Sequence, residues 1–284
     1  MTTPAIRSTG VLAAGTGDIT PVLGTHAAGD TIVLFVTTDT DTLTAPTGYT
    51  IRGKTFLTGQ VIALMVRDTY AASGAESNPT ITDPGNFCAA VALAIQDADK
   101  DKITIAGSSV QGSPLSSTTP SFASVLDDSL ILMAAAWNID NAGPLATSAT
   151  NADVTGLAEA FDAGTLDGNG GGLTVYAGTK ADAGSIRQTD FVLSSGANTS
   201  TLALAIAPKC AVTYAGTVTI DNAPAPNGSN VVKIVDLTQP DDEVITSVTS
   251  GTGAYTASVR YADHLYIAVY DDGTNRGASA AAVP

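Results

Sequence analysis

Short apolar runs separated by Gly, Pro, Asn and Asp recur along the chain. This spacing is typical of strands joined by tight turns. Two runs, Ile32–Val36 and Leu130–Trp137, are apolar at every position. Because successive side chains of a strand point to opposite faces, these runs predict central strands buried on both faces. Only Asn151–Phe161 shows a helical period, and it is the one helix candidate in a chain otherwise predicted to be all-β.

Three pairs of similar segments follow one another in the same order. They are Gly29–Asp39 with Asp127–Trp137, Gly59–Gly74 with Gly171–Gly184, and Val91–Asp99 with Leu202–Lys209. Their order predicts an internal duplication, with halves at residues 29–99 and 127–208 and a partly extended crossover at residues 100–126. One sheet cannot bury its apolar face alone. The halves are therefore expected to cover each other in one jelly-roll-like β-sandwich over residues 29–208, with residues 1–28 as an N-terminal arm or an edge strand.

After Lys209 the pattern changes to an alternation of apolar and polar residues. Such alternation is typical of strands with one buried face, and the residues between these stretches are those favoured in turns. We therefore expect a small β-sandwich module over residues 209–284, which would be marginally stable alone. Its five predicted strands are Thr213–Asp221, Asn230–Leu237, Glu243–Ser250, Ala254–Tyr261 and Leu265–Gly273.

The charge and composition of the chain exclude some classes of binding partner. The chain has 284 residues and a net charge of −15. This charge repels the phosphate backbone of a nucleic acid, so we expect no nucleic-acid binding. No apolar run approaches the ~20 residues of a membrane helix, and the N-terminus lacks the apolar segment of a signal peptide, so neither membrane insertion nor a signal peptide is predicted. The two cysteines, Cys88 and Cys210, leave open whether they pair.

Two acidic residues form the one weak candidate for a metal site. Asp39 and Asp41 alternate with threonines directly after the apolar run Ile32–Val36. If the strand continued, both carboxylates would lie on one face about 7 Å apart and could help to hold a structural divalent cation. The alternative is a solvated strand edge whose acids discourage pairing with another chain. Two other acid-rich segments, Asp97–Lys102 and Asp167–Gly172, lack a complete calcium-loop pattern, so no other cofactor is predicted.

Residues suited to catalysis are sparse. The two histidines, His26 and His264, have no metal-binding partner at helical spacing. The acidic pair Asp271 and Asp272 could serve a glycosidase, but aromatic residues, which bind sugars, make up only 5% of the chain. Trp137, the single tryptophan, ends an apolar run and is expected in the core. We therefore predict no enzymatic activity and no catalytic residues.

Residues 29–208 resemble a repeated β-sandwich of tailed-bacteriophage virion proteins. The resemblance rests on the segments AAGDTIVLFV, TAPTGYT, VIALMVRDT, AAVALAIQDAD, PSFASVLDDSLILMAAAW and TLALAIAP. The second half departs from it, because GPLATSATNADVTGLAEAF replaces the Pro-x-Gly-Tyr turn. Residues 211–273 are similar to a carboxypeptidase-regulatory-like or prealbumin-like module, through GTVTIDNAPAPNGSNVVKIVD, SGTGAYTASV and LYIAVYDDG. This second resemblance implies an Ig- or prealbumin-like β-sandwich for the C-terminal module.

Together the resemblances imply a non-enzymatic structural protein of the phage virion, assembled in the host cytoplasm. The first hypothesis is a tail, baseplate or neck accessory protein, with other virion proteins as partners and with its own copies as a trimer or ring. The C-terminal module would contact a neighbouring protein, or a protein or glycan of the host surface. The alternatives are a capsid decoration (cement) protein, a carbohydrate-binding adhesin module that uses Asp39, Asp41 or Trp137, and a polysaccharide-cleaving enzyme that uses His264 or the Asp271/Asp272 pair.

Overall fold

The computed structural model describes residues 2–57, 59–72, 76–82, 85–110 and 114–209 and, beyond these, the backbone of the C-terminal strands. Contacts divide the chain into two compact units, Thr2–Pro208 and a unit that begins at Lys209. The described elements are antiparallel β-strands, so the predicted all-β class is confirmed. The described part contains no helix long and apolar enough to cross a membrane.

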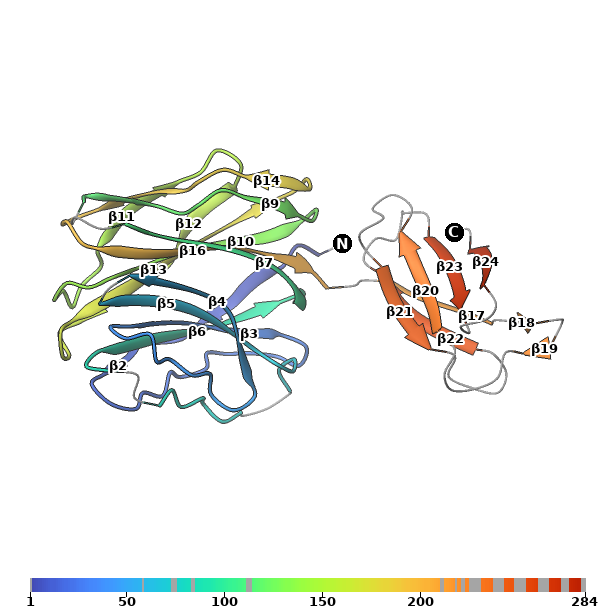
Figure 1. The fold of residues 1–284 in the computed structure, drawn as a ribbon, viewed down its shortest axis with the longest axis horizontal. Helices are drawn as coiled ribbons and strands as arrows, with labels where there is room; N and C mark the ends of the chain where they lie inside the picture. Colours follow the sequence, from blue (N-terminus) through green and yellow to red (C-terminus); the bar gives the residue numbers. More distant parts are fainter. Residues whose placement is uncertain are drawn as a thin grey trace. The chain divides into compact units, whose positions relative to one another are not determined.

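The first sheet of the larger unit has the strand order β1-β6-β3-β5-β4, and β2 also pairs with β6 (Figure 1). Its strands are β1 Ala5–Thr9, β2 Ala13–Gly15, β3 Thr31–Thr38, β4 Tyr49–Leu57, β5 Gln60–Arg67 and β6 Cys88–Gln96.

The second sheet has the order β12-β13-β10-β16-β7. Its strands are β7 Ala98–Val110, β10 Ser129–Trp137, β12 Thr155–Thr165, β13 Gly171–Lys180 and β16 Thr199–Pro208. Two small sheets, β11-β15-β8 and β14-β9, accompany it. Their strands are β8 Ser116–Thr118, β9 Phe122–Val125, β11 Ala146–Thr150, β14 Gly184–Ile186 and β15 Asp190–Leu193.

The two large sheets repeat one topology. If β1, β3, β4, β5 and β6 are matched with β7, β10, β12, β13 and β16, the two strand orders are the same. The register agrees as well: Val33 lies opposite Leu93 in the first sheet, and Leu132 lies opposite Leu204 in the second. The two similar halves predicted from the sequence are therefore present. Each half begins earlier in the chain than predicted, because β1 and β7 belong to the repeat.

A matched backbone turn leads into the central strand of each half. Gly29 before β3 and Asp128 before β10 both have left-handed conformations, with φ of 90° and 54°. The Gly29 N–H donates to the Ala71 carbonyl at 2.9 Å, and the Asp128 N–H donates to the Ala181 carbonyl at 2.8 Å. Asp is one of the few residues other than Gly that adopt this conformation readily, so the second half keeps the turn without a glycine.

The inner core lies between the two sheets and draws on both halves. The larger unit is a sandwich of two sheets, as predicted for a jelly-roll-like fold. Along the chain, all strands of the first sheet come before those of the second. Burying these facing apolar surfaces is the main stabilising contribution. The inner core consists of Val33, Phe35, Ile62, Leu64, Val66, Val91, Leu93, Ile95, Ala98, Leu130, Leu132, Ala134, Ala136, Leu173, Val175, Leu202, Leu204 and Ile206.

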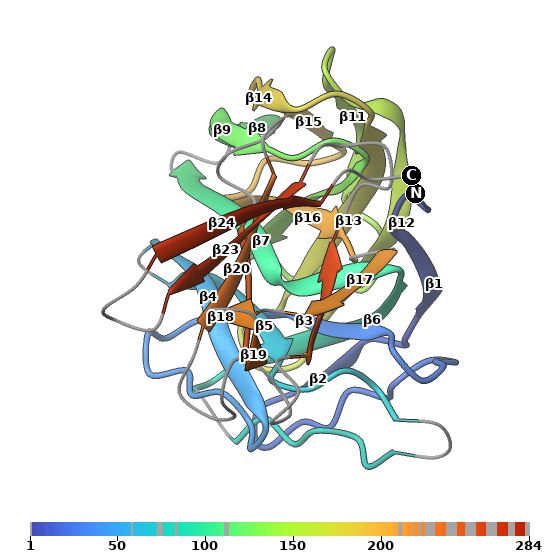
Figure 2. The same cartoon turned by 90° about the vertical axis from the view of Figure 1, so that its right-hand side faces the viewer.

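The outer faces of both sheets are covered too. The small sheets lie on the side of the second sheet that faces away from the first (Figures 1 and 2) and bury Phe122, Ile186 and Phe191 against it. On the first sheet, the connections between strands bury residues such as Ile19 and Ile81. As a result β3, β10 and β16 are buried at every position. The prediction that continuous apolar runs form strands buried on both faces is confirmed.

The helix predicted at Asn151–Phe161 is wrong, because this segment enters β12, an edge strand paired with β13. The register shifts between Thr155 and Ala158 and again between Glu159 and Phe161. Such bulges insert extra residues and change which side chains face inward. Apolar positions therefore recur at intervals other than two, and this spacing imitates a helical period.

The C-terminal unit contains a four-stranded antiparallel sheet, β21-β20-β23-β24, and the pairs β17-β22 and β18-β19. Each of the five predicted strands is found, and β24 adds a sixth long strand that the sequence did not indicate. The bounds are β17 Val212–Thr217, β18 Thr219–Ile220, β19 Ala223–Pro224, β20 Val231–Asp236, β21 Glu243–Ser247, β22 Ala254–Val259, β23 Tyr266–Asp271 and β24 Arg276–Ala281.

Two glycines let edge strands of opposite sheets approach each other. A Cβ on Gly53 of β4 would lie 2.7 Å from Ile105 Cγ2 of β7, and a Cβ on Gly107 of β7 would overlap Thr55 Oγ1 of β4. Side chains at these positions would hold the sheets apart, so the glycines close the sandwich along this side.

We expect Gly107→Val to lower the free energy of unfolding by about 1–3 kcal/mol, the usual cost of overpacking. Trp137 is the only tryptophan and is fully buried in the larger unit, so its fluorescence during urea denaturation measures this unit. Gly17→Val is the control, because nothing lies within 4 Å of a Cβ there. Equal denaturation midpoints for the two variants would contradict the role of Gly107.

An ion pair fixes edge strand β1 on its sheet. The Asp30 side chain is 3% exposed and accepts hydrogen bonds from Arg7 Nε at 2.6 Å, Arg7 Nη2 at 3.2 Å and the Ala27 N–H at 2.8 Å. A carboxylate removed from water needs such partners. Arg187 and Asp153 form a pair of the same geometry near the surface, where the Arg187 side chain is 69% exposed.

These two pairs provide a matched test of burial. Asp30→Asn should lower the free energy of unfolding by about 2–3 kcal/mol, because it weakens several bonds to a buried charged group. Asp153→Asn should have a clearly smaller effect, since exposed ion pairs contribute little. Urea denaturation followed by Trp137 fluorescence measures both changes, and a larger loss in Asp153→Asn would refute the explanation.

Candidate functional site

Asp39 and Asp41 do not lie on a continued strand. β3 ends at Thr38, and both acids lie in the connection to β4. Asp41 Oδ1 pairs with Lys54 Nζ at 2.6 Å, whereas Asp39 Oδ1 is buried beside Gly85 and has no hydrogen-bond partner among the described residues. The alternation that would align the two carboxylates on one face is therefore not formed. Among the described residues, no three His, Cys, Asp or Glu side chains are grouped as metal ligands, and a cation at these acids stays a prediction.

Other candidate residues are placed as follows. Trp137 is fully buried at the end of β10, as predicted, and so offers no surface on which a sugar could stack. His26 Nδ1 lies 2.9 Å from the Gly24 carbonyl, and Cys88 is buried in β6. The backbone of Asp271 ends β23. Three candidates lie outside the described residues: Cys210, His264 and Asp272.

The two acid-rich segments each include a turn, and the residues of the first after Asp97 belong to β7. Asp97, with φ of 57°, lies between β6 and β7, where the chain passes from the first sheet to the second. Gly168 and Gly170, with φ of 61° and 66°, lie between β12 and β13. These glycines therefore serve a tight left-handed connection.

A pocket of about 600 Å³ opens beside the first sheet, where the turn before β4 meets the connection after β5. The predicted Pro-Thr-Gly-Tyr turn forms one wall: the Tyr49 N–H donates to the Pro46 carbonyl at 3.0 Å, and Gly48 has φ of 80°. The Tyr49 pocket, as we name it, is lined by Pro46, Thr47, Gly48, Tyr49, Arg67, Asp68, Thr69, Ala72, Glu76, Ser77, Asn78, Pro79 and Thr80.

Charged groups of the Tyr49 pocket are held in fixed positions. Arg67, at the end of β5, pairs with Glu76, whose side chain is only 10% exposed. Asp68 Oδ1 accepts from Thr50 Oγ1 at 2.6 Å. Burial raises the pKa of Tyr49, and the nearby Arg67 opposes that rise in part. The phenol therefore stays neutral over the physiological range and offers both a donor and an acceptor.

A second pocket, of about 460 Å³, occupies the equivalent place in the second half. It lies where the end of β11 and the residues before β12 meet the segment that leads from β14 into β15. Arg187 forms its ion pair with Asp153 here, and Asn151 Nδ2 donates to the Arg187 carbonyl at 2.8 Å. The Arg187 pocket, as we name it, is lined by Thr150, Asn151, Ala152, Arg187, Gln188 and Asp190.

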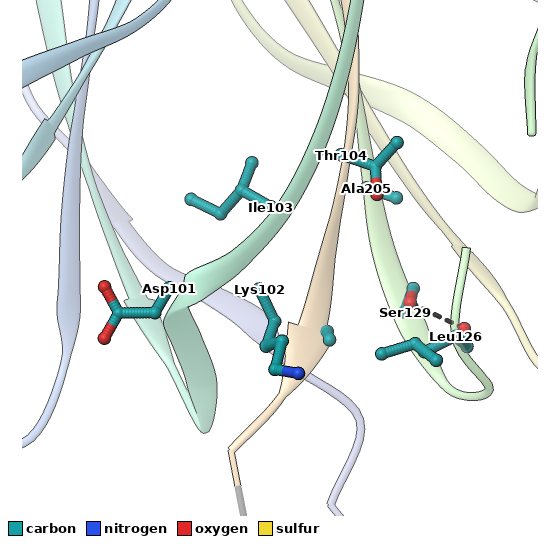
Figure 3. Close-up of a pocket in the computed structure, with 8 residues that line it drawn as sticks. Asp101, Lys102, Ile103, Thr104, Leu126, Ser129 and Ala205 are labelled. Carbon is teal, nitrogen blue, oxygen red and sulfur yellow. Dashed lines mark hydrogen bonds between the residues drawn. The ribbon is translucent and has the colours of Figure 1, made fainter. Parts of the chain in front are cut away.

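A smaller pocket, of about 210 Å³, lies between β7, β16 and β10 (Figure 3). Asp101 and Lys102 are neighbours on β7, and their side chains point to different sides of the strand. At the opposite wall, Ser129 Oγ donates to the Leu126 carbonyl at 2.6 Å. The remaining lining is mostly apolar, so this pocket brings together few groups that could orient a ligand.

Comparison with known proteins gives no guide to this chemistry: no protein-family model, no curated protein and no solved structure matches the chain. The site has to be argued from its own residues. The sequence pattern singled out the turn at Tyr49, but not Arg67, Asp68 or Glu76. The signal available was the end of β5, where an apolar strand changes abruptly to Arg67-Asp68-Thr69.

One carboxylate outside these pockets has an unusual pKa. Burial raises the pKa of Asp162 to about 7, and Glu159 adds to the rise. Hydrogen bonds from the N–H groups of Leu145 and Ala146, at 3.2 and 2.9 Å, oppose it. Nearby, burial and Glu159 together raise the pKa of Tyr176 to about 12. Through these bonds Asp162 joins edge strand β12 to the start of β11. Ionisation of its buried carboxyl has an electrostatic cost for the folded state.

This cost predicts a pH dependence of stability. The pKa of Asp162 is higher in the folded state than in the unfolded state. Its contribution to the free energy of unfolding is therefore fully present below about pH 4 and is lost as the pH rises through about 7. The urea midpoint of the chain should therefore fall between pH 5 and pH 8, and Asp162→Asn should flatten this fall. Asp182→Asn removes an exposed carboxylate as a control. A profile that Asp162→Asn leaves unchanged would show that this carboxyl titrates normally.

Proposed function

We propose that this chain is a non-enzymatic structural protein of a tailed-phage virion. The larger unit is a rigid sandwich, and the C-terminal unit makes contact with neighbouring proteins or the host surface. The observation that carries the proposal is the inner core, which fills the space between the two duplicated sheets with apolar side chains from both halves. A core of this kind suits a load-bearing scaffold, because tightly packed interiors resist deformation.

The sequence supports the virion context. Segments of both halves resemble the repeated sandwich of tailed-phage virion proteins, and the strands that carry this resemblance include the fully buried β3, β10 and β16. A tail, baseplate or neck position is favoured, with capsid decoration as the alternative.

Purified particles of the phage that encodes the chain provide the test. We expect the chain to remain with banded particles, and quantitative mass spectrometry should give three, six or twelve copies for a tail, baseplate or neck position. Tens to hundreds of copies would identify a capsid decoration protein instead. A chain that is made during infection but absent from banded particles would overturn the virion role.

A further inference from the structure

We infer that the Tyr49 pocket is a binding site for a neutral saccharide unit. This inference goes beyond the proposed function and does not depend on it, because it rests on the lining of one pocket in the larger unit. The volume of about 600 Å³ falls within the range of sites that hold small organic ligands. The pocket is formed by two connections on a rigid sheet, an arrangement that often positions binding residues.

The polar lining offers donors and acceptors already fixed in place. Glu76 pairs with Arg67 and also accepts from the Ala72 N–H. Asn78 Oδ1 accepts from the Leu23 N–H at 3.0 Å. Groups held in this way lose little conformational entropy when a ligand binds, so each hydrogen bond to a sugar hydroxyl contributes more to affinity.

Asp68 is fixed from two sides. Its side chain accepts from Thr50 Oγ1 at 2.6 Å, and its N–H donates to the Gly48 carbonyl at 2.9 Å. This pair of bonds ties the end of β5 to the turn that carries Tyr49. A carboxylate of this kind accepts hydrogen bonds from two hydroxyl groups at once, as a vicinal diol of a sugar would require.

Tyr49 supplies the apolar part of the site. Its ring packs partly against the outer core of the first sheet and lines the pocket. An aromatic ring with a neutral hydroxyl presents an apolar face together with a polar tip. A sugar ring has the matching character, with apolar C–H faces and hydroxyl groups around its rim.

The charge of the site points to a neutral ligand. Asp68 and Glu76 outnumber Arg67, the single lysine or arginine in the described lining, and the chain as a whole carries −15. An anionic ligand would be repelled by this field. Because Arg67 and Glu76 neutralise each other, one carboxylate remains for hydroxyl donors.

The Arg187 pocket provides an internal control. It also contains an arginine–carboxylate pair, although this pair joins Arg187, between β14 and β15, to Asp153, before β12. That pocket is smaller, and no aromatic side chain is among its described lining residues. We expect it to bind the same sugars more weakly, and this difference isolates the contribution of Tyr49.

Nuclear magnetic resonance of the full chain tests the inference. A panel of neutral mono- and disaccharides is titrated up to about 50 mM, a range that detects millimolar affinity, while the Arg67 Nε–Hε and Tyr49 ring signals are followed. At least one sugar should shift both signals to saturation. Tyr49→Ala should weaken its affinity at least about tenfold, since an aromatic contact and its buried area are lost. Arg187→Ala should leave unchanged the affinity of the Tyr49 pocket, which the Arg67 and Tyr49 signals report.

A second variant guards against loss of folding. Asp68→Asn preserves the shape of the side chain, and an unchanged Trp137 fluorescence spectrum shows that the larger unit is still folded. We expect this variant to bind the same sugar with an affinity at least about threefold lower, because a charged acceptor is replaced by a neutral one. The inference is overturned if no sugar shifts either signal, if only a cation does so, or if folded Tyr49→Ala and Asp68→Asn bind as tightly as the natural chain.

Discussion

Removal of both faces of each central strand from water is the constraint on which this structure depends. The strands β3, β10 and β16 carry apolar side chains on both faces and are buried throughout. Packing the two halves together buries only the inner face of each sheet. The outer faces need a second covering, which the small sheets supply on one side and long connections supply on the other. The two larger pockets, the Tyr49 pocket and the Arg187 pocket, arise in these coverings.

Much of this architecture could be read from the sequence, because apolar runs and their repetition are local signals. The matched pairs of segments revealed the duplication, and Pro46–Tyr49 was recognised as a turn. Edge strands were harder. β1 and β7 are partly exposed, so they lack the continuous apolar runs of the central strands. β24 has the sequence RGASAA, which is poor in the β-branched and aromatic residues that favour strands.

The candidate site was less predictable for a different reason. The pair Arg67–Glu76 joins the end of β5 to the connection that follows it, and the bond between Thr50 and Asp68 joins β4 to that same connection. No spacing along the chain indicates such pairs. The predicted acidic candidate depended instead on a local pattern that the strand does not follow. The alternation of Asp39 and Asp41 suggested a shared face only as long as β3 continued, whereas the strand ends at Thr38.

The duplication also explains why the two halves differ most in their outer layers. The inner faces constrain each other, since a change of volume in one sheet must be matched in the other. This mutual constraint preserves the register in which Val33 opposes Leu93 and Leu132 opposes Leu204. The outer connections have no such counterpart. One half could build its cover from short strands and the other from a turn with Tyr49, while both kept a hollow at the same place in the repeat. A scaffold fixed by its interior thus leaves its outer layers free to acquire separate binding properties.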